Sequence, residues 1–182
     1  MNNNYIIKHI ASIDEAAVIE RSYSGNEKDT YVMIDHPGTA IVSAKHNHCF
    51  LMLLQYRKII DKVTIEFPGG VIKKGESPLD AVKREFKEET HFELNSPQQL
   101  GSYIASVGTS NEKFHLFVDS LSSTPKGIEI LDSRFEITHN EHTYQLVFVP
   151  DELFVSLIKK GIIYDSKSIL AYFLSSFLGK TI

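Results

Sequence analysis

The sequence predicts an α+β fold in which helices flank a mixed β-sheet. Two observations lead to this prediction. Short runs rich in β-branched and aromatic residues, separated by turn residues, fill most of the first 70 positions and return after residue 100. Helical spacing of apolar residues follows a proline at residue 78 and reappears beyond residue 150. The resulting order is strands, helix, strands and helices.

The N-terminal part of the chain gives the weakest signals. Residues 1–21 are expected to form one strand and a short helical or irregular piece. The polar stretch 22–30 reads as a turn between two strands. Residues 31–35 form a β-rich run, so a second strand is expected there.

A β-hairpin is predicted next. Apolar runs at 39–44 and 49–57 flank a short polar segment with Asn47 as its turn residue. Another short strand is expected at 63–67. The tripeptide Pro68-Gly69-Gly70 ends that strand, and the chain must turn sharply there.

A helix is predicted to begin at Ser77-Pro78. Serine is a good N-cap, and proline fits the first helical position. Leu79, Val82 and Phe86 lie at i, i+3 and i+7, and we expect them to form the apolar stripe.

The second half of the chain repeats both kinds of element. Strands are expected at 100–105, 113–119 and 144–149. Helices are expected at 151–160, with Gly161 at the C-cap, and at 165–178.

Composition narrows the class of protein. The 182 residues suggest one domain, with 1–38 as an N-terminal β-rich extension and 39–182 as the main domain. A net charge of −4 does not favour nucleic acid as a partner. The single cysteine, Cys49, allows no disulfide within the chain. Since no apolar run is long enough to span a bilayer, no membrane contact is expected and the cytoplasm is the expected location.

An acidic cluster in the helix at 78–90 carries the strongest functional signal. Glu85, Glu88 and Glu89 lie at i, i+3 and i+4, so they share one helix face about 5–6 Å apart. Like charges at that distance repel one another, and a divalent cation would relieve the repulsion. Carboxylate oxygens suit Mg²⁺ or Mn²⁺ together with substrate phosphates.

This spacing resembles the signature of the Nudix hydrolases. The family pattern places a glycine, a glutamate, an Arg-Glu pair and a Glu-Glu pair at fixed intervals, followed by a glycine and an apolar residue. The matching residues here are Gly70, Glu76, Arg84, Glu85, Phe86, Glu88, Glu89 and Phe92. His91 stands in place of the last glycine. That position ends the helix, where a positive φ is expected, and histidine is among the side chains that tolerate it.

Segments outside the signature resemble the ADP-sugar pyrophosphatase branch of the family. They are His36-Pro37-Gly38, Gln55-Tyr56-Arg57, Glu66-Phe67-Pro68-Gly69-Gly70 and the run Gly161-Ile162-Ile163-Tyr164-Asp165-Ser166-Lys167-Ser168. One departure is Val107, at a position where that branch usually has proline. The resemblance implies a Nudix-type α/β/α sandwich around a mixed β-sheet. It also implies Mg²⁺-dependent hydrolysis of an ADP-sugar such as ADP-ribose to AMP and a sugar phosphate.

The resemblance also suggests residues for the metal site. Glu85 and Glu89 are the expected ligands of Mg²⁺, or of Mn²⁺ in its place, with Glu88 shared or bridging. The backbone carbonyl of Gly69 is a further ligand by resemblance. Arg84 is expected to hold a carboxylate bidentately and so fix the cluster. Glu76 is expected to anchor the loop or support the ligands.

Three glutamates are candidates for the general base. In the ADP-sugar branch this residue often lies on a loop late in the chain, so Glu141 is the first choice and Glu136 the alternative. In other branches a glutamate of the signature does this work, which makes Glu88 a third candidate.

Substrate contacts are expected from three further residues. Arg57 is the candidate for holding phosphates, although it could instead be a surface arginine paired with Asp61 or Glu66. Glu66 could accept a hydrogen bond from a sugar hydroxyl or an adenine amine. Glu112 could orient the metal or the terminal sugar.

The branch also suggests an assembly and a set of alternatives. Enzymes of this type are usually homodimers whose N-terminal strands reach the partner, and the β-rich segment before residue 40 is consistent with that. The substrate is expected to be a nucleotide sugar such as ADP-ribose. Alternative substrates for an enzyme of this family are another nucleotide sugar, a dinucleotide or an oxidised nucleoside triphosphate. A nucleotide-binding regulator without turnover is the remaining hypothesis.

Overall fold

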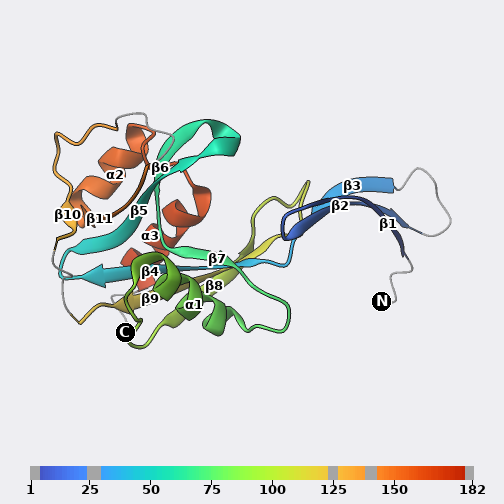
Figure 1. Cartoon of the computed structure of the whole chain (residues 1–182), viewed down its shortest axis with the longest axis horizontal. Coiled ribbons are helices and arrows are strands. Elements are labelled where there is room, and N and C mark those ends of the chain that lie inside the picture. Colours follow the sequence, from blue (N-terminus) through green and yellow to red (C-terminus); the bar gives the residue numbers. More distant parts are fainter. Residues whose placement is uncertain (1–4, 24–29, 123–126, 138–142, 179–182) are drawn as a thin grey trace.

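The computed structural model describes residues 5–23, 30–122, 127–137 and 143–178. These residues form a main body and a three-stranded sheet that extends away from it (Figure 1). Helices in the described part of the chain all fall short of the length and apolarity needed to cross a membrane.

A mixed sheet forms the centre of the body. Its strands, among the described residues, are β4 (Thr39–His46), β5 (Cys49–Arg57), β6 (Lys62–Glu66), β7 (Gly69–Val71), β8 (Gln98–Ile104), β9 (Lys113–Ser120), β10 (Glu129–Ile130) and β11 (Tyr144–Pro150). They lie in the order β10-β11-β5-β4-β9-β8, with β6 paired to β5 and β7 paired to β4. The β4–β9 and β10–β11 pairs are parallel and the others are antiparallel.

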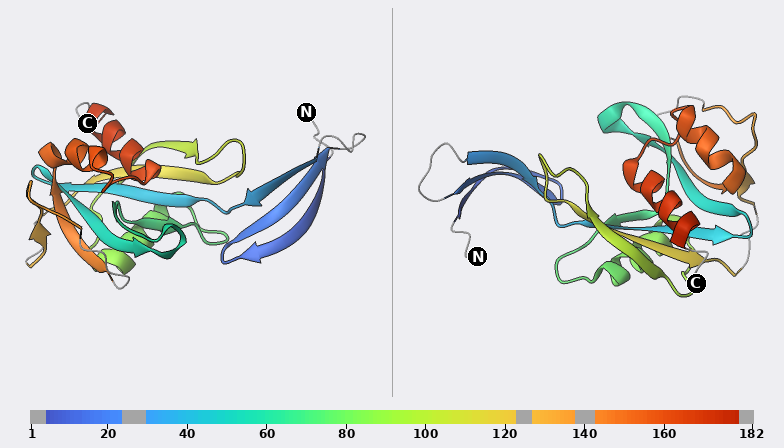
Figure 2. Two further views of the ribbon diagram at one scale, coloured as in Figure 1. Left: turned by 90° about the horizontal axis from the view of Figure 1, so that it is seen from above. Right: turned by 180° about the vertical axis from the view of Figure 1, so that it is seen from behind.

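Helices cover both faces of this sheet. Helix α1 (Pro78–Thr90) packs on β4 and β7. Helix α2 (Asp151–Lys159) packs on β11, and α3 (Ser166–Leu178) packs on β4, β8 and β9. Figure 2, left, shows α1 below the sheet and the other two helices above it. The predicted α+β class and the α/β/α sandwich are therefore confirmed.

Side chains of each central strand alternate between the two layers. Ile41 belongs to the core under α2 and α3, whereas its neighbours Ala40 and Val42 belong to the core under α1. In the same way, Phe50 and Met52 of β5 join the first core. Alternation of this kind is the period-2 pattern of a strand with apolar layers on both sides.

The N-terminal segment differs from the prediction. Strands β1 (Tyr5–Ile13), β2 (Ala16–Tyr23) and β3 (Thr30–Asp35) form an antiparallel sheet of their own. The expected helical or irregular piece before residue 21 is wrong, because Asp14 takes a left-handed φ of 47° and lets the chain reverse within two residues. The predicted turn at 22–30 falls between β2 and β3, and residues 24–29 lie outside the described part of the chain.

This sheet touches the body through β3 and the β8–β9 loop. The backbone N–H of Ile34 donates to the carbonyl of Thr109 at 2.8 Å, and the N–H of Asn111 donates back to Ile34 at 3.2 Å. The Asn111 side chain also accepts from the N–H of His36 at 2.8 Å. The loop is therefore tied to the point where the chain enters β4.

The sharp turn after β6 depends on Gly69. Its φ is +156°, and a Cβ there would lie 2.2 Å from the carbonyl oxygen of Ala40. No side chain fits in that space, so only glycine lets β7 approach β4 this closely.

Helix α1 begins and ends as its sequence predicts. The Ser77 hydroxyl accepts the N–H of Asp80 at 3.1 Å, and Pro78 is the first helical residue. His91 takes the left-handed C-cap conformation at φ 62°. The apolar stripe differs from the prediction, because Leu79 is 39 % exposed. In the first turn that position points away from the sheet, and the buried face consists of Ala81, Val82, Phe86 and Thr90.

Helix α3 is tied to the strand that precedes the glycine turn. The Asp165 carboxylate accepts from the backbone N–H and the hydroxyl of Ser168, both at 2.8 Å. The Ser168 hydroxyl in turn accepts the N–H of Phe67 at 3.0 Å, and Ser168 is fully buried. This chain of bonds fixes the start of α3 against the backbone two residues before Gly69.

We predict that Ser168→Ala lowers the free energy of unfolding by about 1–3 kcal/mol, because the buried N–H of Phe67 loses its acceptor. Ser175→Ala is the matched control on the same helix. Its hydroxyl donates to the carbonyl of Tyr172 within the helix, so a loss of about 0.5 kcal/mol or less is expected. Urea denaturation measures both variants, and equal effects would contradict this account.

Candidate active site

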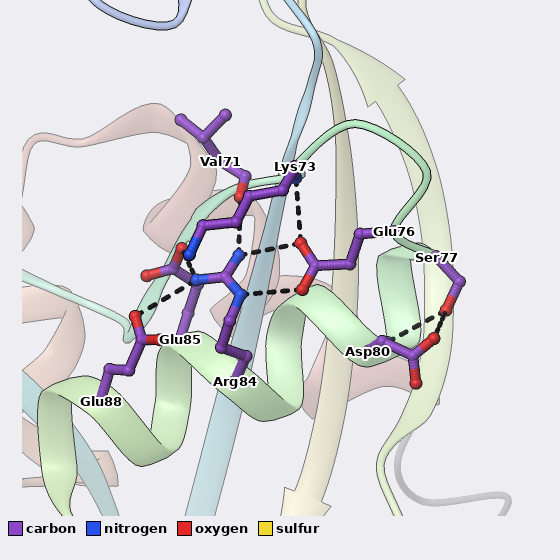
Figure 3. A network of polar contacts seen from close by, with 8 residues as sticks. All are labelled: Val71, Lys73, Glu76, Ser77, Asp80, Arg84, Glu85 and Glu88. Atoms are coloured by element: carbon purple, nitrogen blue, oxygen red, sulfur yellow. Dashed lines mark hydrogen bonds and ion pairs between the residues drawn. The ribbon is translucent and has the colours of Figure 1, made fainter.

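Arg84 lies at the centre of the acidic cluster (Figure 3). Its Nε and Nη2 donate to the two carboxylate oxygens of Glu76 at 2.8 and 2.9 Å. Nη2 also donates to the carbonyl of Val71 at 3.0 Å. This bidentate contact joins α1 to the loop that follows β7, and it holds the pKa of Glu76 at about 2.

The same guanidinium reaches two carboxylates of the helix. Arg84 Nη1 donates to Glu85 at 2.5 Å and to Glu88 at 3.2 Å. Glu76 also accepts the backbone N–H of Lys73 at 2.9 Å. One partly buried cation therefore offsets the repulsion within the cluster and fixes the loop in front of it.

Glu89 lies on the other side of the cluster. Its Oε2 accepts the N–H of Gly69 at 2.9 Å. Burial raises the pKa of Glu89 to about 7; the bond from Gly69 lowers the pKa, and the nearby charge of Glu85 raises it further. The carboxylate is thus placed where its charge is costly unless a cation accompanies it.

Gly70 gives Glu85 its position. A Cβ at Gly70 would lie 2.4 Å from the carboxyl carbon of Glu85. The glycine pair at 69–70 therefore leaves room for two carboxylates, Glu85 and Glu89, against one stretch of backbone. This cradle supplies hard oxygen ligands, the chemistry that Mg²⁺ and Mn²⁺ require.

The three carboxylates of the acidic cluster lie further apart than their spacing in the sequence predicts. Among the described residues, no group of three His, Cys, Asp or Glu side chains lies close enough together to hold a metal ion. Glu88 explains the difference, because its side chain is 55 % exposed and turns toward Arg84. The structure brings Glu85 and Glu89 to the glycine pair and leaves Glu88 at the rim.

A pocket of about 770 Å³ opens beside the glycine pair. The tip of the β5–β6 hairpin forms one wall, including the 3₁₀ turn η1 (Lys58–Ile60). Thr39 of β4 and residues 164–167 before and at the start of α3 form the other. Gly69, Gly70 and Val71 line its floor, so a ligand in the pocket lies next to the acidic cluster.

Arg57 and Glu66 line this pocket as an ion pair. Arg57 Nε donates to Glu66 Oε1 at 3.0 Å, and Nη2 contacts Oε2 of the same carboxylate. The pairing is one of the alternatives that the sequence left open for Arg57. It places the cation at the pocket without excluding a ligand, since a guanidinium has five N–H donors.

Glu112 contacts two residues of the other wall and is not itself among the residues that line the pocket. Its Oε1 accepts from Lys167 Nζ at 3.0 Å and from the Thr39 hydroxyl at 3.1 Å. Burial alone would raise the pKa of Glu112, but the charge and hydrogen bond of Lys167 bring that pKa below its usual value. Lys167 and Thr39 both line the pocket, and the sequence did not single them out.

The remaining candidates are less informative. Glu141 lies outside the described residues. Glu136 is exposed, between Phe135 and Ile137, which pack against the core. Val107 is 91 % exposed in the β8–β9 loop and is not among the residues that line the pocket.

Comparison with known proteins identifies the family of this chain. The family model of the NUDIX domain matches residues 36–164. The methanol dehydrogenase activator of Bacillus methanolicus is 31 % identical over 140 residues, which cover 76 % of this chain and 72 % of that protein. The ADP-ribose pyrophosphatase of Bacillus subtilis (strain 168) is 24 % identical over 176 residues, covering 88 % of this chain and 91 % of that protein.

Solved structures support the fold. A crystal structure of an ADP compounds hydrolase superposes with a TM-score of 0.71 at 16 % identity, covering 98 % of this chain and 94 % of the other. The domain match contains the glycine pair, the acidic helix and the wall formed by the β5–β6 hairpin, and it ends at residue 164, within the other wall. This chain is therefore a member of the NUDIX hydrolase family.

Proposed function

We propose that this protein is a Mg²⁺-dependent pyrophosphohydrolase that cleaves an ADP-sugar, such as ADP-ribose, to AMP and a sugar phosphate. The observation that carries the proposal is the meeting of Glu85 and Glu89 at the glycine pair, beside a pocket that also holds Arg57. The names of two relatives support the substrate class. They are the Bacillus subtilis ADP-ribose pyrophosphatase and the ADP-sugar pyrophosphatase of Mus musculus, the latter 29 % identical over 82 residues (45 % of this chain, 38 % of that protein).

The residues present fit a divalent cation. Glu85, Glu89 and the carbonyl of Gly69 would hold it, with Glu88 joining from the rim. Bound Mg²⁺, or Mn²⁺ in its place, would neutralise phosphate charge and lower the pKa of a bound water. Arg84 keeps the carboxylates in place through its bonds to Glu76 and Glu85.

Arg57 is the residue that we assign to the phosphates. Its pKa is raised, first by the hydrogen bond to Glu66, so the guanidinium stays charged at every working pH. Glu66 uses Nε and one Nη, which leaves further N–H donors for phosphate oxygens. Glu66 therefore orients Arg57, and a contact from its carboxylate to the substrate is a second role that the pocket geometry allows.

We predict that the protein with Mg²⁺ hydrolyses ADP-ribose between its two phosphates, which mass spectrometry in ¹⁸O-labelled water detects. Glu85→Gln and Glu89→Gln should each lower kcat/KM on the order of 100-fold or more, because each removes a charged metal ligand. Glu93→Gln is the matched control, since Glu93 is exposed and pairs with Lys87 beyond the cluster.

Wild-type turnover in Glu85→Gln or Glu89→Gln would mean that the metal binds elsewhere. A wild-type protein that binds ADP-ribose with Mg²⁺ in calorimetry and leaves it intact would instead be a nucleotide-binding regulator. Hydrolysis of a different nucleotide in preference to ADP-ribose would keep the enzyme class and change the substrate.

The general base is proposed to be Glu141, with Glu136 and Glu88 as alternatives. The base acts only on the attacking water, so its Gln variant should lower kcat by about 100-fold or more and leave KM nearly unchanged. Steady-state kinetics of Glu141→Gln, Glu136→Gln and Glu88→Gln compare the three. If Glu141→Gln changes KM alone, Glu141 is not the base.

Residues 1–38 are proposed to be an extension that joins two copies of the chain into a homodimer. The β1–β3 sheet extends from the body in every view (Figures 1 and 2). Large apolar side chains are exposed on it, namely Ile6, Ile7, Ile10, Tyr31, Val32 and Ile34. A sheet this small cannot bury both of its faces alone, and a second copy would cover them.

We predict the mass of a dimer in light scattering coupled to size-exclusion chromatography. The double variant Ile6→Asp/Val32→Asp places charges on two side chains that are 69 % and 60 % exposed, and it should shift the protein to a monomer. Val155→Asp, at an exposed position on α2, is the control and should remain dimeric. A monomeric wild type would contradict the proposal.

A further inference from the structure

Two polar side chains of the pocket wall formed by β4 and the start of α3, Thr39 and Lys167, share the Glu112 carboxylate, which does not itself line the pocket. Lys167 Nζ donates to Glu112 at 3.0 Å, and the Thr39 hydroxyl donates to the same oxygen at 3.1 Å. The side chains of Lys167 and Glu112 are 26 % and 17 % exposed. Two distant segments, β4 and α3, thus converge on one carboxylate of the β8–β9 loop.

The position of this group follows from strand register. Ile41 pairs with Gly69 and Thr39 pairs with Val71, so Thr39 lies two residues further along the floor of the pocket. Two residues of strand span about 6–7 Å. Arg57 belongs to the β5–β6 hairpin on the other wall. A diphosphate held between the glycine pair and Arg57 would therefore direct one of its substituents toward Lys167.

The chemistry of this group suits hydroxyl groups better than phosphate. Lys167 and Glu112 form a pair without net charge, whereas a phosphate site needs excess positive charge. An ammonium has three N–H donors, and Glu112 occupies one of them here. The Thr39 hydroxyl can accept as well as donate. Donors and acceptors side by side are what neighbouring sugar hydroxyls require.

We propose that Lys167, positioned by Glu112 and Thr39, binds hydroxyl groups of the sugar that the diphosphate carries. This inference rests on the proposed function and specifies it: the sugar occupies the pocket beside the start of α3. It also changes the role of Glu112 from a direct ligand to a positioning residue. Lys167 then determines which substituent of the nucleoside diphosphate is accepted.

The test compares two non-hydrolysable ligands in calorimetry with Mg²⁺. One is α,β-methylene ADP-ribose, and the other is the methyl ester of α,β-methylene ADP, which has the same charge and keeps the adenosine but lacks the terminal ribose. Lys167→Met should weaken binding of the first ligand by about 10- to 100-fold, because hydrogen bonds from a charged donor are lost. It should change binding of the second less than about 2-fold, since the ester lacks the terminal ribose whose hydroxyls Lys167 is proposed to bind.

Three further variants make the result specific. Lys159→Met is the control, because Lys159 is an exposed lysine in the last turn of α2. Lys167→Arg keeps a cationic donor and should recover part of the affinity for the sugar ligand. Glu112→Gln should weaken binding of α,β-methylene ADP-ribose alone, and by a smaller factor than Lys167→Met does. If Lys167→Met fails to fold, Glu112→Gln takes its place in the test.

The outcomes separate this inference from the proposed function. Equal weakening of both ligands would make Lys167 a contact to the phosphates or the adenosine that they share. No weakening of either would make it structural, and either result overturns the inference. Equal affinity of the wild type for both ligands overturns it too, while hydrolysis of ADP-ribose would still support the proposed function. A sugar-dependent loss in a protein that leaves ADP-ribose intact would support the contact and contradict the enzyme.

Discussion

The contact between Arg84 and the carboxylates of Glu76 and Glu85 is the interaction on which the site depends. Three glutamates on one turn of α1 repel one another, and burial of Glu89 adds to the cost. Arg84 offsets the repulsion from within the cluster and ties the helix to the loop after β7. A divalent cation between Glu85 and Glu89 would offset the repulsion that remains between these two carboxylates. The same charges therefore affect both the stability of the fold and metal binding.

The rest of the fold positions this cluster against a pocket. Gly69 and Gly70 let the backbone pass close to β4 and to the Glu85 carboxylate, where any side chain would collide. Ser168, on the helix layer at the opposite face of the sheet, holds the backbone N–H of Phe67, two residues before Gly69. Side chains from both helix layers thus bind the backbone of one turn, at Phe67 and Gly69, and both residues line the pocket.

Local chemistry could be predicted from the sequence, and long-range contacts could not. The cap at Ser77, the turn at Asn47 and the left-handed His91 depend on neighbouring residues, and all three are found. The N-terminal hairpin was missed because its turn at Asp14 lacks glycine. Lys167 meets Glu112 across 55 positions of sequence, and no spacing rule predicts such a pair.

The most direct test of the central claim is the position of the metal. A crystal of the protein with Mn²⁺ and α,β-methylene ADP-ribose, measured by anomalous diffraction, locates the ion without assumptions about activity. We predict at least one Mn²⁺ coordinated by oxygens of both Glu85 and Glu89 at about 2.0–2.3 Å, with the diphosphate completing its coordination. An ion bound away from these two carboxylates, or a diphosphate bound with no ion beside the glycine pair, would contradict the account.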